Sequence, residues 1–330
     1  MRHKLQIYLS YLLIFCLLVF ISNQVIHAEP VKVGVSIWTG WMPIYLMEEK
    51  GFLKRRAQEY GVEIELKKFK DYLASVQAFT AGELDACAMT IMDALPPADA
   101  GIDVAAVLVN DFSKGGDGIL VQYGIDGSNF KGVEILLEEF SVSHYLLLRY
   151  LETIGLTERD IKMKNTPGDD AGRAFLAGNA EAVATWNPHL FLAEDAGRGY
   201  VLFNSKKIPG EIIDLVVFNN KRLKQNPKVA QAFVSAWYDA MEMIKNSETR
   251  QEAIIIMSDL AGATPAEFNK MLEGTDLFLD PQRAIDFLNS EEIRKTEKKV
   301  VKFAQSHGLI NDEVNLKYDA TVIQTVRPMK

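Results

Sequence analysis

Acidic and aromatic side chains recur just after the predicted strands of this chain. The candidate binding residues among them are Trp38, Trp41, Asp93, Asp111, Glu138, Asp169, Trp186 and Asp214. Carboxylates accept forked hydrogen bonds from planar cations, and an indole face attracts a desolvated cation by about 2 kcal/mol. For an anion each carboxylate near 4 Å costs up to about 4 kcal/mol. These residue types therefore predict a site for a small cation.

Each residue also has a plainer interpretation. An acid in the first turn of a helix complements the helix dipole, and Asp169 has the position of an N-cap. Trp38 and Trp41 could pack in the core. Glu138 and Glu139 are adjacent, so only one of them is expected to face a ligand. The remaining alternative is an anion site, for which Arg173 and Lys114 are the available cations.

Other chemistry has weaker support in the sequence. His144 and His189 lack a close-spaced His or Cys cluster, so we expect no metal. Cys87 lies within a predicted strand and is expected to be an inert core residue. The glycine-rich segment 115–118 precedes a strand and is interpreted as a crossover turn. We expect neither a cofactor nor catalysis.

Strands and helices alternate along the chain and position these residues. Apolar runs at 31–37, 62–69, 84–90 and 104–110 are separated by helical patterns, and the order restarts with 132–139, 161–165, 180–186 and 200–204. Such alternation predicts an α/β fold in which mostly parallel sheets are flanked by helices. The segment 212–220 is expected to return to the first sheet, and 220–308 to be mainly helical. Ligands of such sheets bind beyond the carboxyl ends of the strands.

Two segments of similar sequence support a pair of related lobes. AFTAGELDACA (78–88) and AFLAGNAEAVA (174–184) match at a constant offset of 96 residues. In each, a helix is expected to end at a glycine, Gly82 or Gly178, where a positive φ costs little. We predict a first lobe formed by 29–111 and 214–330, a second formed by 132–203, and hinge crossings at 112–131 and 204–213.

The N-terminus predicts export. Arg2 and Lys4 precede an apolar run at 8–21, and Ala28 ends a cleavage site, so 1–28 is interpreted as a signal peptide; an uncleaved anchor is the alternative. Cys16 follows Phe15, which is unlike a lipid-attachment signal. Cleavage leaves 34 basic and 44 acidic side chains, a net charge of −10 that disfavours nucleic acid as a partner. A single remaining cysteine excludes an intrachain disulfide.

Several motifs of the chain resemble one protein family. They are WTGWMPIYLMEEKGFLKR after the opening strand, the AFTAGELDA turn, PPADAGIDV, and the AFLAGNAEA turn followed by WNPH. In these the chain resembles the solute-binding proteins of ABC importers in the nitrate, taurine and aliphatic-sulfonate group, which also includes binders of a thiamine pyrimidine precursor. SIWTGW, VND, LEEFSVSH, PGDDAG and TWNP look like a subgroup associated with urea or guanidine carboxylation systems.

The resemblance implies a two-lobed type II periplasmic-binding-protein fold and a periplasmic protein that delivers its ligand to the transmembrane subunits of an ABC permease. It also implies a small nitrogen-rich solute, with guanidine as our first choice and urea or a related amine behind it. The alternatives are a binder of sulfonate, taurine, nitrate or a pyrimidine precursor, and an enzyme on the same scaffold.

Overall fold

The computed structural model describes residues 29–326, and the predicted signal segment 1–28 lies outside them. A seven-stranded sheet is ordered β11-β4-β10-β3-β1-β2, with β12 paired to β4. β1 to β4 and β12 run in one direction, whereas β10 and β11 run antiparallel to β4. Its strands are β1 (Val31–Val35), β2 (Ile64–Lys68), β3 (Ala86–Thr90), β4 (Val104–Ser113), β10 (Ile213–Asn219), β11 (Thr275–Leu277) and β12 (Lys317–Tyr318).

A five-stranded sheet is ordered β7-β6-β8-β5-β9, and only β5 opposes the direction of the other four. Its strands are β5 (Asp117–Val121), β6 (Glu134–Leu137), β7 (Lys162–Asn165), β8 (Ala182–Trp186) and β9 (Tyr200–Asn204). The prediction of a two-sheet α/β fold with mostly parallel strands is therefore confirmed.

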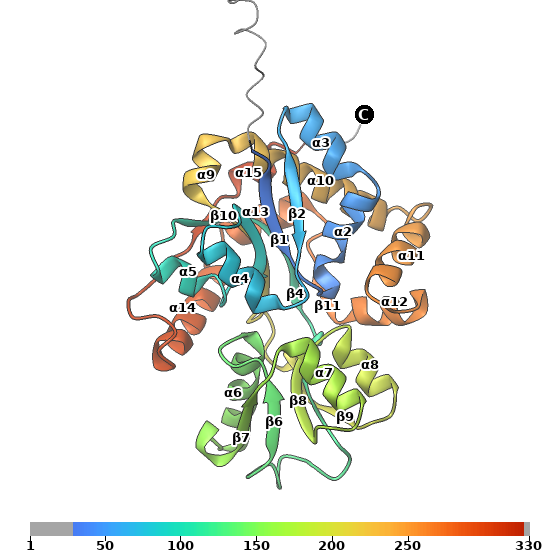
Figure 1. Cartoon of the computed structure of the whole chain (residues 1–330), viewed down its shortest axis with the longest axis vertical. Coiled ribbons are helices and arrows are strands. Elements are labelled where there is room, and N and C mark those ends of the chain that lie inside the picture. The colour runs from blue at the N-terminus through green and yellow to red at the C-terminus, as the bar shows by residue number, and fades with distance from the viewer. Residues whose placement is uncertain (1–28, 327–330) are drawn as a thin grey trace, which may run out of the picture. The chain divides into compact units, whose positions relative to one another are not determined.

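Helices flank both sheets (Figure 1). Three of them, α6 (Val142–Ile154), α7 (Gly168–Leu176) and α8 (His189–Asp195), connect strands of the five-stranded sheet. The others are α2 (Met42–Glu49), α3 (Phe52–Tyr60), α4 (Tyr72–Thr80), α5 (Leu95–Asp99), α9 (Asn220–Gln225), α10 (Pro227–Lys245), α11 (Arg250–Leu260), α12 (Pro265–Glu273), α13 (Pro281–Leu288), α14 (Glu291–Ser306) and α15 (Thr321–Gln324). Three short 3-10 turns are η1 (Thr39–Trp41), η2 (Glu158–Asp160) and η3 (Ser205–Lys207). Among the described residues, none of the helices combines the length and apolar character that crossing a membrane requires.

The two similar segments fold alike. Gly82 and Gly178 follow α4 and α7 with φ of 78° and 80°, a left-handed conformation that glycine adopts at little cost. The turns then lead into β3 and β8, all ten residues of which are buried. These strands end at Thr90 and Trp186, which are also 96 residues apart. The repeated turn therefore brings two equivalent strand ends to corresponding places in the two sheets.

Two short segments join the sheets. The chain leaves β4 at Ser113 and enters β5 at Asp117, and it returns between Asn204 and Ile213. β5 thus lies inside the range 112–131 that the sequence assigned to the first crossing. Ser205 in the second segment receives the backbone N–H of Gly115 in the first at 2.6 Å, so the two segments are tied to each other.

The C-terminal third covers the first sheet. α10 buries Trp237 completely, and its Asp239 accepts two hydrogen bonds of 2.7 Å from Arg56 of α3. Both side chains of this ion pair are about 5% exposed. Removing either partner of such a buried pair leaves an uncompensated charge, which costs about 3–5 kcal/mol.

Candidate ligand-binding site

A cavity lies beyond the ends of strands from both sheets. Its volume is about 280 Å³. Ligand pockets for drug-sized molecules span about 300–1,000 Å³, so this cavity suits a smaller ligand. Its lining residues are Trp38, Trp41, Tyr72, Thr90, Asp117, Val142, Trp186, Ile212 and Asp214.

Aromatic rings form the walls of this cavity. The ring centroids of Trp41 and Tyr72 are 5.5 Å apart, and those of Tyr72 and Trp186 are 5.9 Å apart with an edge-to-face angle of 77°. Trp186, at the end of β8, donates its indole N–H to the backbone carbonyl of Ile37, just after β1, at 3.1 Å. The indole therefore contacts both sides of the cavity.

Glycines make room for Trp38. Its indole N–H lies 3.3 Å from both carboxylate oxygens of Asp111. A Cβ on Gly40 would lie 1.9 Å from an oxygen of Asp111, and a Cβ on Gly116 would lie 2.4 Å from the Trp38 ring. Real Cβ atoms do not approach other atoms so closely. Only glycine at these two positions allows the observed contact between Trp38 and Asp111.

Four aspartates lie at or directly behind the lining. Asp117 and Asp214 line the cavity, whereas Asp93 accepts hydrogen bonds of 2.6 Å from the hydroxyls of Tyr72 and Thr90. Burial raises the pKa of Asp93 to about 6 and that of Asp117 to about 7, although hydrogen bonds partly offset the effect. The carboxylates are thus held where ionisation is costly.

The most perturbed pair is Asp111 and Asp214. They face each other across the antiparallel pairing of β4 and β10, where two ionised carboxylates would repel each other. Burial raises the pKa of Asp111 to about 8, and burial together with the charge of Asp111 raises the pKa of Asp214 well above its ordinary value. A cation in the cavity would offset that repulsion.

Glu138 and Glu139 differ in their surroundings. Glu138 is 3% exposed, whereas Glu139 is partly exposed. Burial, followed by the charge of Asp93, raises the pKa of Glu138 to about 8. One oxygen of Glu138 has no hydrogen-bond partner, and neither does the indole N–H of Trp41. Unpaired buried polar groups are uncommon in proteins and are expected where a ligand completes the site.

The predicted residues fall into three groups. Four of them line the cavity: Trp38, Trp41, Trp186 and Asp214. Three are buried next to these: Asp93, Asp111 and Glu138. Asp169 is not in the lining, because it begins α7 and pairs with Arg173 at 3.3 Å.

Tyr72 and Thr90 follow or end strands, as the strand-end rule requires, but were not among the candidates, and the sequence reasoning missed Asp117, Val142 and Ile212 altogether. Asp117 stands in the segment 115–118, which was interpreted only as a turn. The sequence feature that could have identified Asp117 is its position directly before the apolar run of β5. An acid at the start of a buried strand requires a polar or charged partner.

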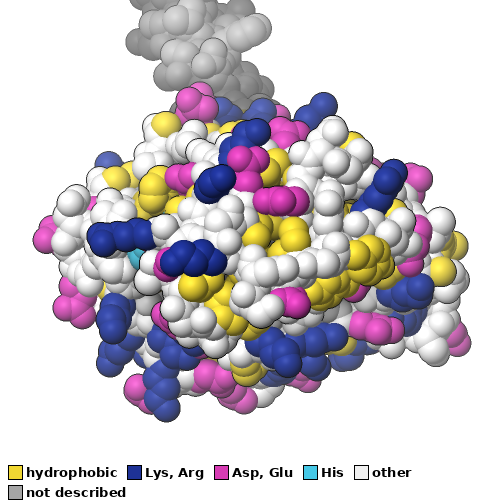
Figure 2. Space-filling view, turned by 90° about the horizontal axis from the view of Figure 1, so that it is seen from below, with side chains coloured by type: hydrophobic (Ala, Val, Ile, Leu, Met, Phe, Trp, Pro, Cys, Tyr) yellow, Lys and Arg dark blue, Asp and Glu magenta, His cyan; other side chains and the backbone are white. Residues whose placement is uncertain are grey.

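No basic side chain lines the cavity within residues 29–326. The Arg173 side chain is 56% exposed and is paired with Asp169 and Asp170, and Lys114 is exposed. On the face seen from below, by contrast, Lys and Arg side chains lie beside Asp and Glu (Figure 2). The carboxylates that line the cavity have no basic side chain beside them in the lining.

Three known proteins are similar to this chain. A protein of Bacillus subtilis (strain 168), provisionally named an aliphatic sulfonates-binding protein, is 20% identical over 88% of this chain and 86% of its own length. The alkanesulfonate-binding protein SsuA of Xanthomonas axonopodis pv. citri, solved with bound MOPS, has a TM-score of 0.73 and 19% identity, covering 88% of this chain and all of its own. The nitrate-binding protein NrtA of Synechocystis PCC 6803 has a TM-score of 0.66 and 13% identity over 91% and 86% of the two chains.

These structural likenesses establish the fold of periplasmic solute-binding proteins. The model of the family described as NMT1-like matches residues 26–258, which is more than two thirds of the sequence. With that match and the fold in place, this chain belongs to the NMT1-like family.

Proposed function

We propose that this protein is the extracytoplasmic solute-binding component of an ABC importer and that it captures a small planar cation of the guanidinium type. The observation that carries the proposal is a small cavity lined by two buried carboxylates and four aromatic rings, with no basic side chain in the lining among the described residues.

Charge is the first support for a cationic ligand. Asp117 and Asp214 line the cavity, and Asp93 and Asp111 are buried behind it. An anion would meet repulsion of up to about 4 kcal/mol from each ionised carboxylate at 4 Å. A guanidinium ion offers forked N–H donors that match one or two carboxylates, so it satisfies the same groups that exclude an anion.

The aromatic walls are the second support. Trp38, Trp41, Tyr72 and Trp186 surround the same small space. Aromatic faces attract cations by about 2 kcal/mol or more where water is excluded, and a flat ion can stack on an indole. Urea has the same shape without the charge, so we expect it to bind more weakly than guanidinium.

Capture requires that the two sides of the cavity separate and rejoin. The predicted lobes supply the sides, and the tied segments 114–116 and 205–212 are suitable hinges. The bond from Trp186 to Ile37 is a contact that would form on closing. A ligand that touches both sides favours the closed state, which the permease would recognise.

The names of the relatives favour a different ligand. The Bacillus subtilis and Xanthomonas proteins are named for sulfonates and the Synechocystis protein for nitrate, and these are anions. Sulfonate binding is therefore the second candidate. It would require the cavity carboxylates to be protonated or a basic side chain to turn inward.

Calorimetry of the mature protein with guanidinium, urea and taurine in parallel separates the candidates. We expect heat with guanidinium, a weaker response with urea and none with taurine. Heat with taurine and none with guanidinium would overturn the cationic ligand.

A matched pair of variants tests the site itself. Asp214→Asn should weaken guanidinium binding at least tenfold, yet raise the melting temperature of the empty protein because it removes repulsion from Asp111. Asp169→Asn removes an acid outside the lining and should change affinity less than twofold. Equal effects of the two substitutions would contradict the assigned cavity.

A further inference from the structure

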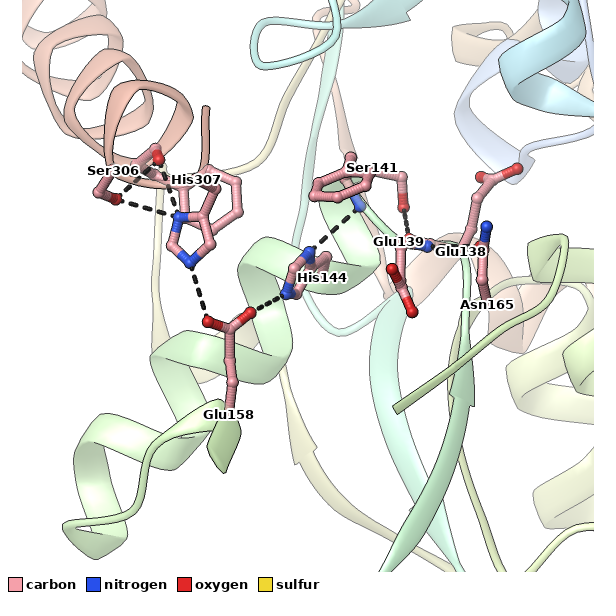
Figure 3. A network of polar contacts seen from close by, with 10 residues as sticks. Glu138, Glu139, Ser141, His144, Glu158, Asn165, Ser306 and His307 are labelled. Carbon is pink, nitrogen blue, oxygen red and sulfur yellow. Dashed lines mark hydrogen bonds and ion pairs between the residues drawn. The ribbon is translucent and has the colours of Figure 1, made fainter. Parts of the chain in front are cut away.

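Three side chains meet where helix α14 ends against the part of the chain that carries the five-stranded sheet (Figure 3). His144 lies on α6, Glu158 in η2, and His307 directly after α14. The Nε2 of His144 lies 2.6 Å from one oxygen of Glu158, and the Nε2 of His307 lies 3.2 Å from the other. Glu158 therefore bridges segments that are about 150 residues apart in sequence.

A backbone N–H fixes the direction of the first contact. The N–H of Phe140 donates to Nδ1 of His144 at 3.1 Å, so this nitrogen carries no proton. Burial lowers the pKa of His144, which favours the neutral ring. The remaining proton is then on Nε2 and is donated to Glu158. This half of the network is complete without any added proton.

A backbone carbonyl fixes the direction of the second contact. Nδ1 of His307 lies 2.9 Å from the carbonyl oxygen of Phe303, which can only accept, so Nδ1 carries a proton. The hydroxyl of Ser306 donates to the same carbonyl at 2.8 Å, so it too can only accept from Nδ1. A neutral His307 would thus turn the lone pair of Nε2 toward a carboxylate oxygen of Glu158. The contact becomes a hydrogen bond only when His307 or Glu158 takes up one more proton.

A metal ion is the competing explanation, because the three side chains lie close enough together to surround one. The proton on Nε2 of His144 opposes it. Coordination there would require the proton to move to Nδ1, where it would face the N–H of Phe140. A proton satisfies every atom of the network, whereas a metal ion would break one bond of it.

We propose that His144, Glu158 and His307 form a proton-dependent clasp that holds the end of α14 against α6 and η2. The clasp is complete while the additional proton is bound and loses its second bond when that proton leaves. In the open form α14 no longer has a hydrogen bond to η2 at this point.

Other charged groups surround the clasp. Glu139 lies near His144 and favours its charged form. The cleft beside His307 is lined from α6 by Arg149 and Glu152 and from α14 by Lys299 and Lys302. These side chains are common to the wild-type protein and to the variants tested below, so they form a constant background.

A second contact in this region does not depend on pH. Glu211 lies in the segment between β9 and β10. Its carboxylate accepts hydrogen bonds from the hydroxyl of Tyr145 at 2.6 Å, the guanidinium of Arg149 at 2.9 Å and the ammonium of Lys299 at 2.7 Å. Burial raises the pKa of Glu211, but these bonds outweigh it and lower the pKa to about 2. Glu211 stays ionised at any physiological pH, so its contacts with α6 and α14 do not depend on the proton that completes the clasp.

Single-molecule energy transfer in the ligand-free mature protein tests the clasp. Lys54→Cys on α3 and Lys162→Cys on β7 place dyes at exposed positions, and the buried Cys87 is protected from labelling. We expect the ratio of closed to open molecules to fall about tenfold between pH 5.5 and 8, which is the effect of a partly exposed charged hydrogen bond. His307→Gln keeps a donor that does not titrate and should abolish this change. His189→Gln, which replaces a histidine at the start of α8, should retain it.

Three results would overturn the proposal. They are a ratio that does not respond to pH, a His307→Gln protein with the wild-type response, and closing at pH 8 that requires added Zn²⁺ and is reversed by a chelator. Because the cavity carboxylates also titrate, the difference between wild type and His307→Gln carries the conclusion.

Nitrogen NMR of the histidine rings provides a measurement that does not depend on a variant. We expect His144 to keep its only proton on Nε2 from pH 5.5 to 8, and His307 to hold a proton on Nδ1 throughout. A proton on Nδ1 of His144 would refute the assigned directions. No cargo is needed for either experiment, so failure of the clasp would leave the proposed guanidinium site untouched.

Discussion

Changing the pH from 5 to 7 should strengthen guanidinium binding about fiftyfold through the ionisation of Asp117 alone. The lining carboxylate of Asp117 has a pKa of about 7, so it is mostly protonated at pH 5, whereas guanidinium stays charged throughout. Binding a cation to the ionised form then requires the loss of a proton, which at two units below the pKa costs about 2.7 kcal/mol. The ionisation of Asp93, with a pKa of about 6, adds up to a further tenfold between pH 5 and 7.

Titration calorimetry in two buffers of different ionisation enthalpy measures both the affinity and the protons released. Near pH 6 the uptake of one guanidinium ion should release close to one proton from Asp117. Asp117→Asn should flatten the pH profile, and Asp169→Asn should preserve it. A dissociation constant that is the same at pH 5 and 7, with no proton release, would refute the assignment of buried carboxylates as the cation-binding groups.

Three further predictions concern the cavity walls and the empty protein. Gly40→Ala should destabilise the fold by about 1–3 kcal/mol, because its Cβ meets Asp111 and displaces Trp38; urea unfolding measures this, and an unchanged midpoint would contradict the contact. Trp186→Phe removes the indole N–H bond to Ile37 and should weaken guanidinium binding about three- to tenfold in calorimetry, while a variant of full affinity would show that the bond is irrelevant to capture. The buried carboxylates have folded-state pKa values above those of the unfolded chain, so stability from their protonation is fully present below about pH 4 and is lost as the pH rises to about 8. The melting temperature of the ligand-free protein should therefore fall across this range, millimolar guanidinium should oppose the fall at pH 8, and a melting temperature that rises instead would contradict the raised pKa values.

The fold was predictable because local pattern and topology agree. The alternation of apolar strands with helices predicted both sheets, and the turns at Gly82 and Gly178 marked their shared geometry. The pattern did not indicate that β5 would join the second sheet. This strand follows two glycines at 115–116, and its pairing with β8 is antiparallel and distant in sequence, so nothing local specified it.

The site was predictable only where the strand-end rule applies. Trp186 is the last residue of β8 and Asp214 is the second residue of β10, and both line the cavity. Asp169 satisfied the same rule, but a basic residue one helical turn later captures it. Arg173 is four residues after Asp169, a spacing that allows an ion pair on one face of a helix. The sequence alone does not show whether Asp169 pairs with this neighbour or contacts a ligand. Asp117 was missed for the opposite reason, because its glycine neighbours suggested a turn.

The cross-strand acids Asp111 and Asp214 have a consequence for the life of the protein in the cell. Like charges placed opposite each other on paired strands work against folding, and bound cargo relieves that opposition. Ligand-free molecules then unfold more often and are more readily cleaved by proteases. We expect the cellular amount of this protein to follow the concentration of its ligand, without any change in the rate of transcription.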